Sequence, residues 1–291
     1  MIPICGAVAI ALIALLAVTF WPGEKEPEYQ GKKLSEWVEL ASNTQEEQKA
    51  QSAVRQIGTN ALPWLLKWTK HEPWHEKHHG ILIAFLPTTL KERISATGWK
   101  QTGLAAKGFQ ALGAQATPAI PQLNTIVHGE QWASSLIALD ALVEIGEPAV
   151  PALQGIMADP QWLLRQNAII AIGNAGRLGT NERAAINLLI PALHDTNRQV
   201  AFMAATMLKC FGDQTERVVP ELVQCLNSSD PELQVAAIAS LGHFAKKAES
   251  AAPNLALKLE VPDRRIRLEA TNALRRIAPE VLTNGVSGVH E

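Results

Sequence analysis

Small and apolar residues recur along the chain with a spacing that predicts the buried faces of helices. In each copy of the pattern, a small residue is usually followed by another three places later, by large apolar residues at four and seven, and by glycine or alanine at eight. Residues at the first four of these places lie on one face of a helix with about 3.6 residues per turn. The pattern occurs seven times, and its copies start at Ala50, Ala105, Ala138, Ala168, Ala204, Ala237 and Ala270.

The intervals between these copies predict stacked helical hairpins. Five of the six intervals span 30–36 residues and the first spans 55, and periods of about this size are typical of helical repeat arrays. Six copies are followed by a Pro-x-Leu signature, and proline is well tolerated in the first turn of a helix. We therefore expect an A helix that carries the alanines and ends in a left-handed turn at the eighth position. A B helix should then begin near each of Pro63, Pro121, Pro151, Pro191, Pro220 and Pro253.

Together the two signatures resemble HEAT repeats, particularly the bacterial HEAT-like kind also found in phycobilisome lyases, over residues 46–283. Arg165 and Arg267 lie three residues before their starting alanines, where that family often has an arginine. Residues 29–37 resemble the lead-in of membrane-associated HEAT proteins. The resemblance implies an all-α, right-handed α-solenoid of about seven HEAT-type helical hairpins, and it implies only a loose function.

The N-terminus predicts a membrane anchor. Residues 2–21 contain no charged side chain, and twenty apolar residues in a helix are enough to cross a bilayer. The basic start and small-residue cleavage site of a signal peptide are not evident, so we expect an uncleaved transmembrane helix, with a signal as the alternative. The predicted organisation is an anchor at 1–21, a linker and lead-in helix at 22–45, a solenoid at 46–283 with an irregular insertion at about 68–98, and a tail at 284–291.

The side of the membrane is left open by the sequence. Lys25, Lys32 and Lys33 follow the apolar span, so the positive-inside rule alone would place the repeats in the cytoplasm. The family resemblance implies the cell envelope instead, and we expect the repeats on the extracytoplasmic side. Cys210 and Cys225 should lie at opposite ends of an antiparallel hairpin, about 15 Å apart, which is too far for a disulfide.

One motif suggests metal chemistry. His75-Glu76-Lys77-His78-His79 matches H-E-x-x-H, in which two histidines on one helical face bind zinc and the glutamate activates water. The stretch is dense in histidine, no third histidine follows it at metzincin spacing, and it lies in the irregular first interval. We therefore expect a solvated histidine-rich loop, a non-catalytic protein and no cofactor. A zinc-dependent peptidase remains the alternative.

Three tryptophans share one position in consecutive repeats. Trp99, Trp132 and Trp162 each lie six residues before a starting alanine, at the margin of the buried stripe. Such a row predicts a packing ladder between repeats, because tryptophan is usually largely buried. The alternative is an aromatic strip that binds a peptide or glycan.

The charge pattern argues against nucleic acid as a partner. The net charge is −2, and the C-terminal arginines are interspersed with acidic residues, as expected for a polar cap on the last repeat. The arginines in question are Arg264, Arg265, Arg267, Arg275 and Arg276.

These observations predict a membrane-tethered scaffold that binds a protein or peptide. We expect the B helices to line the concave side, with outward amide residues as binding candidates: Gln122, Asn124, Gln154, Asn187, Gln224 and Asn254. The alternatives are a bilin-lyase-like chaperone, implied by the resemblance alone, the zinc peptidase, and a structural component of an envelope assembly that associates end to end. The identity of the partner and the oligomeric state are left open.

Overall fold

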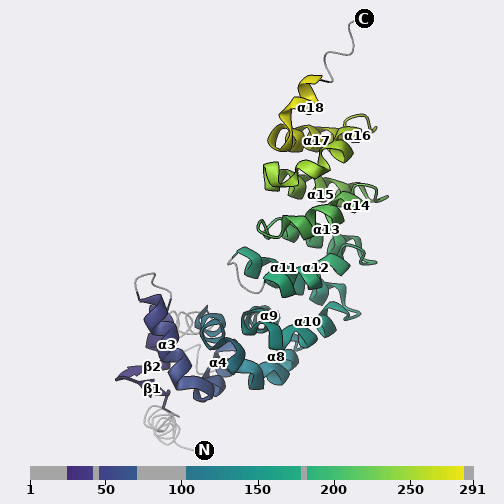
Figure 1. Cartoon of the computed structure of the whole chain (residues 1–291). Coiled ribbons are helices and arrows are strands. Elements are labelled where there is room, and N and C mark those ends of the chain that lie inside the picture. The colour runs from purple at the N-terminus through teal and green to yellow at the C-terminus, as the bar shows by residue number, and fades with distance from the viewer. Residues whose placement is uncertain (1–24, 42–45, 71–102, 178–181, 285–291) are drawn as a thin grey trace, which may run out of the picture.

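The structure, a computed structural model, describes residues 25–41, 46–70, 103–177 and 182–284, which form a curved array of helical hairpins (Figure 1). Residues 103–112 are helical and form the second A helix. The other A helices are α3 (Glu47–Ile57), α9 (Trp132–Ile145), α11 (Trp162–Arg177), α13 (Arg198–Leu208), α15 (Pro231–Phe244) and α17 (Arg264–Ile277). The B helices are α4 (Leu62–Thr69), α8 (Ile120–Val127), α10 (Val150–Met157), α12 (Glu182–Ala192), α14 (Thr215–Cys225), α16 (Ala252–Leu257) and α18 (Pro279–Asn284).

A short lead-in precedes the first repeat. The strands β1 (Glu28–Tyr29) and β2 (Lys32–Lys33) form a two-stranded antiparallel hairpin, and α2 (Leu34–Leu40) follows directly. The buried Trp37 donates a hydrogen bond from Nε1 to the Tyr29 carbonyl at 2.9 Å, which ties α2 to the hairpin. The sequence predicted the helix in this segment but not the hairpin.

The alanine pattern forms the centre of the core, as the sequence predicted. All seven starting alanines are fully buried. From α9 to α17 each A helix packs against the next A helix along the array, and each B helix from α8 to α16 packs against the A helix that follows it. The approach between A helices is close: a Cβ added to Gly242 in α15 would lie 3.1 Å from the Ala273 Cα in α17. Small residues are therefore required where successive A helices meet.

The prolines start most B helices, with two exceptions. Pro63, Pro121, Pro151 and Pro253 lie in the first turn of their helices, but the prediction for Pro191 and Pro220 was wrong. Pro220 lies inside α14, five residues after its first residue, and Pro191 is the penultimate residue of α12. Proline has no N–H to donate, and after Pro191 the chain continues in tighter turns, with the Leu193 and His194 N–H groups donating to carbonyls three residues back.

The end of the A helix adopts a positive φ in some repeats and not in others. Gly58, Gly113 and Gly146 have φ values of 60°, 52° and 85°, as the pattern predicted. Ala245 has φ 50° and ψ −132°. Ala278 departs from the prediction, with φ −152°.

Several predicted features lie outside the described residues. They are the anchor at 2–21, nearly all of the insertion at 68–98, the His75–His79 motif and Trp99. None of the helices in the described ranges combines the length and the hydropathy needed to cross a bilayer. Both Cys210 and Cys225 are free thiols.

We expect Ala245→Gly to stabilise the protein. A Cβ is disfavoured at φ 50°, and relief of that strain should exceed the entropy cost of glycine and raise the free energy of unfolding by about 1 kcal/mol. Urea unfolding of the variant measures the gain. Ala278→Gly, at the same place in the last repeat but with extended φ, is the matched control and should lose about 0.5–1 kcal/mol. Equal losses in both variants would contradict the strain at Ala245.

Candidate interaction surface

The A helices, rather than the B helices, line the concave side of the array. In Figure 1 the helices α9, α11, α13 and α15 face the hollow of the curve, whereas α10, α12, α14 and α16 lie on the outside. Successive A helices also contact one another more extensively than successive B helices do. Because the inner arc of a curved array is the shorter one, the layer with the smaller interhelical spacing lies on the concave side. The prediction that B helices line the concave side was wrong.

The amide residues proposed as binding candidates therefore lie on the convex side. Gln122, Gln154, Asn187 and Gln224 are exposed, and Asn124 and Asn254 are half-buried. Asn187 accepts a hydrogen bond from Arg217 at 2.6 Å, which joins α12 to α14. Whether these amides bind a partner stays a prediction, but they do not form the inner surface for which they were chosen.

Two rows of side chains run along the concave side, and we call them the inner rows. They occupy the positions two and six residues after each starting alanine, opposite the buried stripe of each A helix. From α9 to α17 every member is half-buried or exposed, whereas Ala111 in the A helix before α9 is buried. From α9 to α17 the first row is Asp140, Ile170, Thr206, Ala239 and Asn272, and the second is Glu144, Asn174, Cys210, His243 and Arg276.

The end of the inner rows at α9 is acidic. Asp140 and Glu144 lie one helical turn apart, and both are half-buried. Burial raises the pKa of Asp140 to about 6. Burial, followed by repulsion from Asp140, raises the pKa of Glu144 to about 7, although a hydrogen bond from Gln110 acts in the opposite direction. Within the described part of the chain, neither carboxylate forms an ion pair with a basic side chain.

The opposite end is basic. His243 and Arg276 continue the second inner row, and Lys209 and Lys247 lie beside it. A shallow pocket of about 580 Å³ opens there, lined by Lys209, Cys210, Gly212, His243, Phe244 and Lys247. Lys247 Nζ donates to the Gly212 carbonyl at 2.9 Å and lies 3.2 Å from the Asp213 carboxylate. The charge on the inner surface therefore changes from negative at α9 to positive at α13–α17.

Comparison with known proteins identifies the repeats. The family model described as HEAT repeats matches residues 120–209 and 150–229, and the model of the single HEAT repeat matches residues 218–248. Residues 120–248 carry HEAT repeats. Comparison with curated proteins gave no match.

Two solved structures are similar over most of the chain. An engineered protein from a structural genomics consortium is 18% identical, with 87% of this chain and 97% of that chain covered and a TM-score of 0.43. A designed armadillo repeat protein is 16% identical, with 84% of this chain and all of that chain covered and a TM-score of 0.39. These scores are too low to carry an inference about function.

In four repeats the side chain three places before the starting alanine joins the repeat to the chain that precedes it. Arg165 Nη1 donates to the carbonyls of Asp159 at 2.7 Å and Pro160 at 3.2 Å. Arg267 Nη1 makes the equivalent bonds to Val261 and Pro262. In two other repeats, shorter side chains do the same: Ser135 donates to Val127, and Gln234 donates to Ser228. The family arginine is thus one of several donors that satisfy carbonyls at the end of the previous B helix or in the loop after it.

Ion pairs along the same edge join consecutive HEAT repeats. Arg165 also forms a bidentate pair with Asp195, in the loop that leads from α12 into the next A helix α13, at 2.8 and 2.7 Å. Burial alone would raise the pKa of Asp195, but the bonds from Arg165 and from the Asn197 N–H lower it below its ordinary value. Arg198 forms a bidentate pair with Asp230, and Arg265 pairs with Glu232. The sequence did not reveal these pairs, because their partners lie about one repeat apart.

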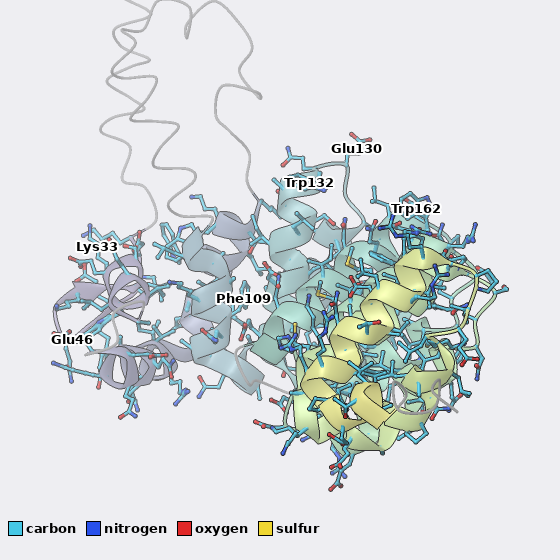
Figure 2. All side chains as sticks on the ribbon, turned by 90° about the horizontal axis from the view of Figure 1, so that it is seen from above. Lys33, Glu46, Phe109, Glu130, Trp132 and Trp162 are labelled. Atoms are coloured by element: carbon cyan, nitrogen blue, oxygen red, sulfur yellow. The ribbon has the colours of Figure 1, made fainter. Side chains whose placement is uncertain are left out.

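The tryptophans lie at the edge of the array formed by the N-terminal ends of the A helices, and they are not packed between repeats. Trp132 is 65% exposed and Trp162 is 44% exposed, and each is the first residue of its A helix. Figure 2 shows both side chains at one margin of the array, near Glu130. The packing ladder was wrong for these two residues, because few atoms cover a side chain at the first position of a helix. The aromatic strip stays a prediction.

We expect Arg165→Ala to destabilise the HEAT array by about 2–3 kcal/mol. Arg165 is 9% exposed, and its loss leaves the Asp195 carboxylate without its charged partner and two carbonyls without their donor. Arg198→Ala is the matched control, because the Arg198 side chain is 75% exposed and its pair should contribute less than about 1 kcal/mol. Chemical unfolding of both variants makes the comparison, and equal losses would contradict the stronger coupling at Arg165.

The acidic pair should lower the stability of the protein at neutral pH and above. Asp140 and Glu144 bind protons more readily in the folded chain than in the unfolded chain, because their pKa values rise from 3.8 and 4.5 to about 6 and 7. The fold should therefore lose stability as pH rises from about 4 to about 8. Asp140→Asn with Glu144→Gln should raise the free energy of unfolding at pH 8 by about 1–2 kcal/mol, below the full value of the shifts because both groups keep some solvent.

Urea unfolding at pH 8 and pH 4 measures this effect, and the gain should vanish at pH 4. Glu216→Gln with Glu280→Gln removes two charges from exposed first-turn positions on B helices and is the control, with no gain in stability expected at either pH because first-turn carboxylates are stabilising. If Asp140→Asn with Glu144→Gln left the stability at pH 8 unchanged, the two carboxylates would have to be well solvated or paired with positive charge in the folded protein.

Proposed function

We propose that this HEAT-repeat protein is a non-catalytic scaffold that holds a protein partner along the concave side of its A helices. We also propose that residues 2–21 tether it to a membrane, with the repeats on the extracytoplasmic side. The HEAT fold is compatible with protein interaction. The observation that supports partner binding on the concave side is the half-buried acidic pair formed by Asp140 and Glu144.

The acidic pair is better explained by binding than by folding. Two like charges one turn apart repel each other, and partial burial removes water that would stabilise them. Residues that lower the stability of a fold are expected chiefly at functional sites. A cationic group from a partner would remove both penalties at once.

The middle of the concave side suits an apolar partner. Phe202 and Met203 in α13 are half-buried beside the inner rows. Methionine adapts its shape to different partners, and aromatic side chains contribute strongly at interfaces. A partner segment could therefore bury apolar side chains there and hydrogen-bond to Thr206 and Asn174 at the same time.

The zinc-peptidase alternative is not tested by the described residues. No group of three or more metal-ligating side chains occurs within residues 25–41, 46–70, 103–177 and 182–284. The His75–His79 motif lies outside these ranges.

Site-specific photo-crosslinking in the native membrane tests the scaffold. A photoreactive amino acid at Thr206 or Ala239, on the concave side, should capture one recurrent protein partner. The same residue at Gln154 or Gln224, on the convex side, should capture markedly less of it. Capture from the convex positions alone would overturn the proposed surface.

Fractionation of the same cells tests the membrane tether. If alkaline carbonate extracted all of the protein from the membranes, residues 2–21 would not act as a membrane anchor.

A further inference from the structure

From α9 to α17 the inner surface changes from acidic to basic. Because successive repeats present equivalent positions, the two inner rows can be followed from repeat to repeat. The A helix before α9 contributes the exposed Lys107 and the buried Ala111, and α9 contributes two carboxylates, Asp140 and Glu144. The rows continue through uncharged side chains on α11 and α13 and end with His243 and Arg276 on α15 and α17. The pocket with Lys209 and Lys247 adds two more amines at the second end.

The two charged ends are separated by a distance that a short segment can span. Two interhelical steps lie between α9 and Lys209 at the end of α13, four lie between α9 and α17, and neighbouring packed helices are about 8–10 Å apart. The span is therefore about 16–20 Å to Lys209 and about 32–40 Å to α17. An extended strand of about five to twelve residues covers these distances at about 3.3 Å per residue, and a helix needs about 11 to 27 residues at about 1.5 Å each.

The acidic end is suited to one cationic side chain. Asp140 and Glu144 lie on the same face of α9, so the head group of one lysine or arginine can contact both. Both carboxylates have already lost part of their hydration in the free protein. The desolvation needed to form the pair is therefore smaller than at an exposed site, and the attraction is screened less.

The basic end is suited to a carboxylate. Lys209, His243 and Lys247 converge on the pocket, with the exposed Arg276 further along the same row. Lys247 already contacts Asp213, whose side chain is 83% exposed and therefore easily displaced. The uncharged stretch around Ile170, Phe202 and Thr206 offers nothing to a polyanion, so a nucleic acid or an anionic membrane surface fits this side poorly.

We propose that the partner segment held on the concave side is itself charge-polarised: a lysine or arginine sits between Asp140 and Glu144, apolar side chains cover the middle, and an aspartate or glutamate enters the pocket of Lys209 and Lys247. This proposal rests on the proposed function and adds to it the chemistry of the partner and its direction along the array. The two ends act as separate determinants, since a separation of about 16–40 Å is at least twice the screening length at physiological salt.

Selection of displayed random 20-residue peptides on the full-length chain tests the proposal. Peptides selected on the wild type should carry Lys or Arg toward one end, apolar residues in the middle and Asp or Glu toward the other. Selection on Asp140→Asn/Glu144→Gln should lose the basic preference and keep the acidic one. Selection on Lys209→Gln/Lys247→Gln should do the reverse. The variant Glu216→Gln/Glu280→Gln changes the net charge as much as the first variant does and should leave both preferences intact.

A double-mutant cycle on one selected peptide then assigns the contact. The inner-pair variant should weaken binding of the parent peptide at least tenfold, and should have no effect on the peptide whose basic residue is changed to glutamine. Peptides that crosslink to a probe at Thr206 but show no charge preference would overturn this inference and leave the proposed function standing. Peptides that bind without crosslinking to the concave side, or a selection that yields no binder, would count against both.

Discussion

The close contact between successive A helices is the constraint on which the rest of the structure depends. Alanine at each starting position and glycine at positions such as Gly242 allow two backbones to approach within van der Waals contact. The B helices carry larger residues and lie further apart. An array with one tight layer and one loose layer must bend toward the tight layer, so the same small residues that build the core also decide which helices form the inner surface.

This packing also explains why the acidic pair is unusual. On a closely packed layer, a side chain opposite the buried stripe is flanked by the neighbouring helices and loses water even though it points outward. Asp140 and Glu144 are in that situation, and their raised pKa values report it. Thr206 and Ala239 occupy equivalent positions without any such penalty. The charge at α9 is therefore a departure from what the packing favours.

The sequence predicted the part of the fold that repeats and missed the part that depends on neighbours. Spacing alone located all seven buried alanines, because helical periodicity is local. The curvature was misassigned, although the small residues on the A helices already contained the signal. The pair of Arg165 and Asp195 was invisible, because its members are separated by thirty positions and meet only once two repeats are in register. Trp132 was expected to be buried from its residue type, but its place at the first residue of a helix leaves it 65% exposed.

In a repeat protein, function is carried by the differences between equivalent positions. The backbone of one hairpin resembles that of the next, so equivalent positions in successive repeats differ mainly in residue type. In the second inner row the residue type changes from Glu144 through Asn174 and Cys210 to His243 and Arg276. Packing does not require this order, because each of these side chains lies at least partly outside the core. A gradient of charge with no role in folding is what a surface that orients its partner needs, because each end then favours the group that the other end repels.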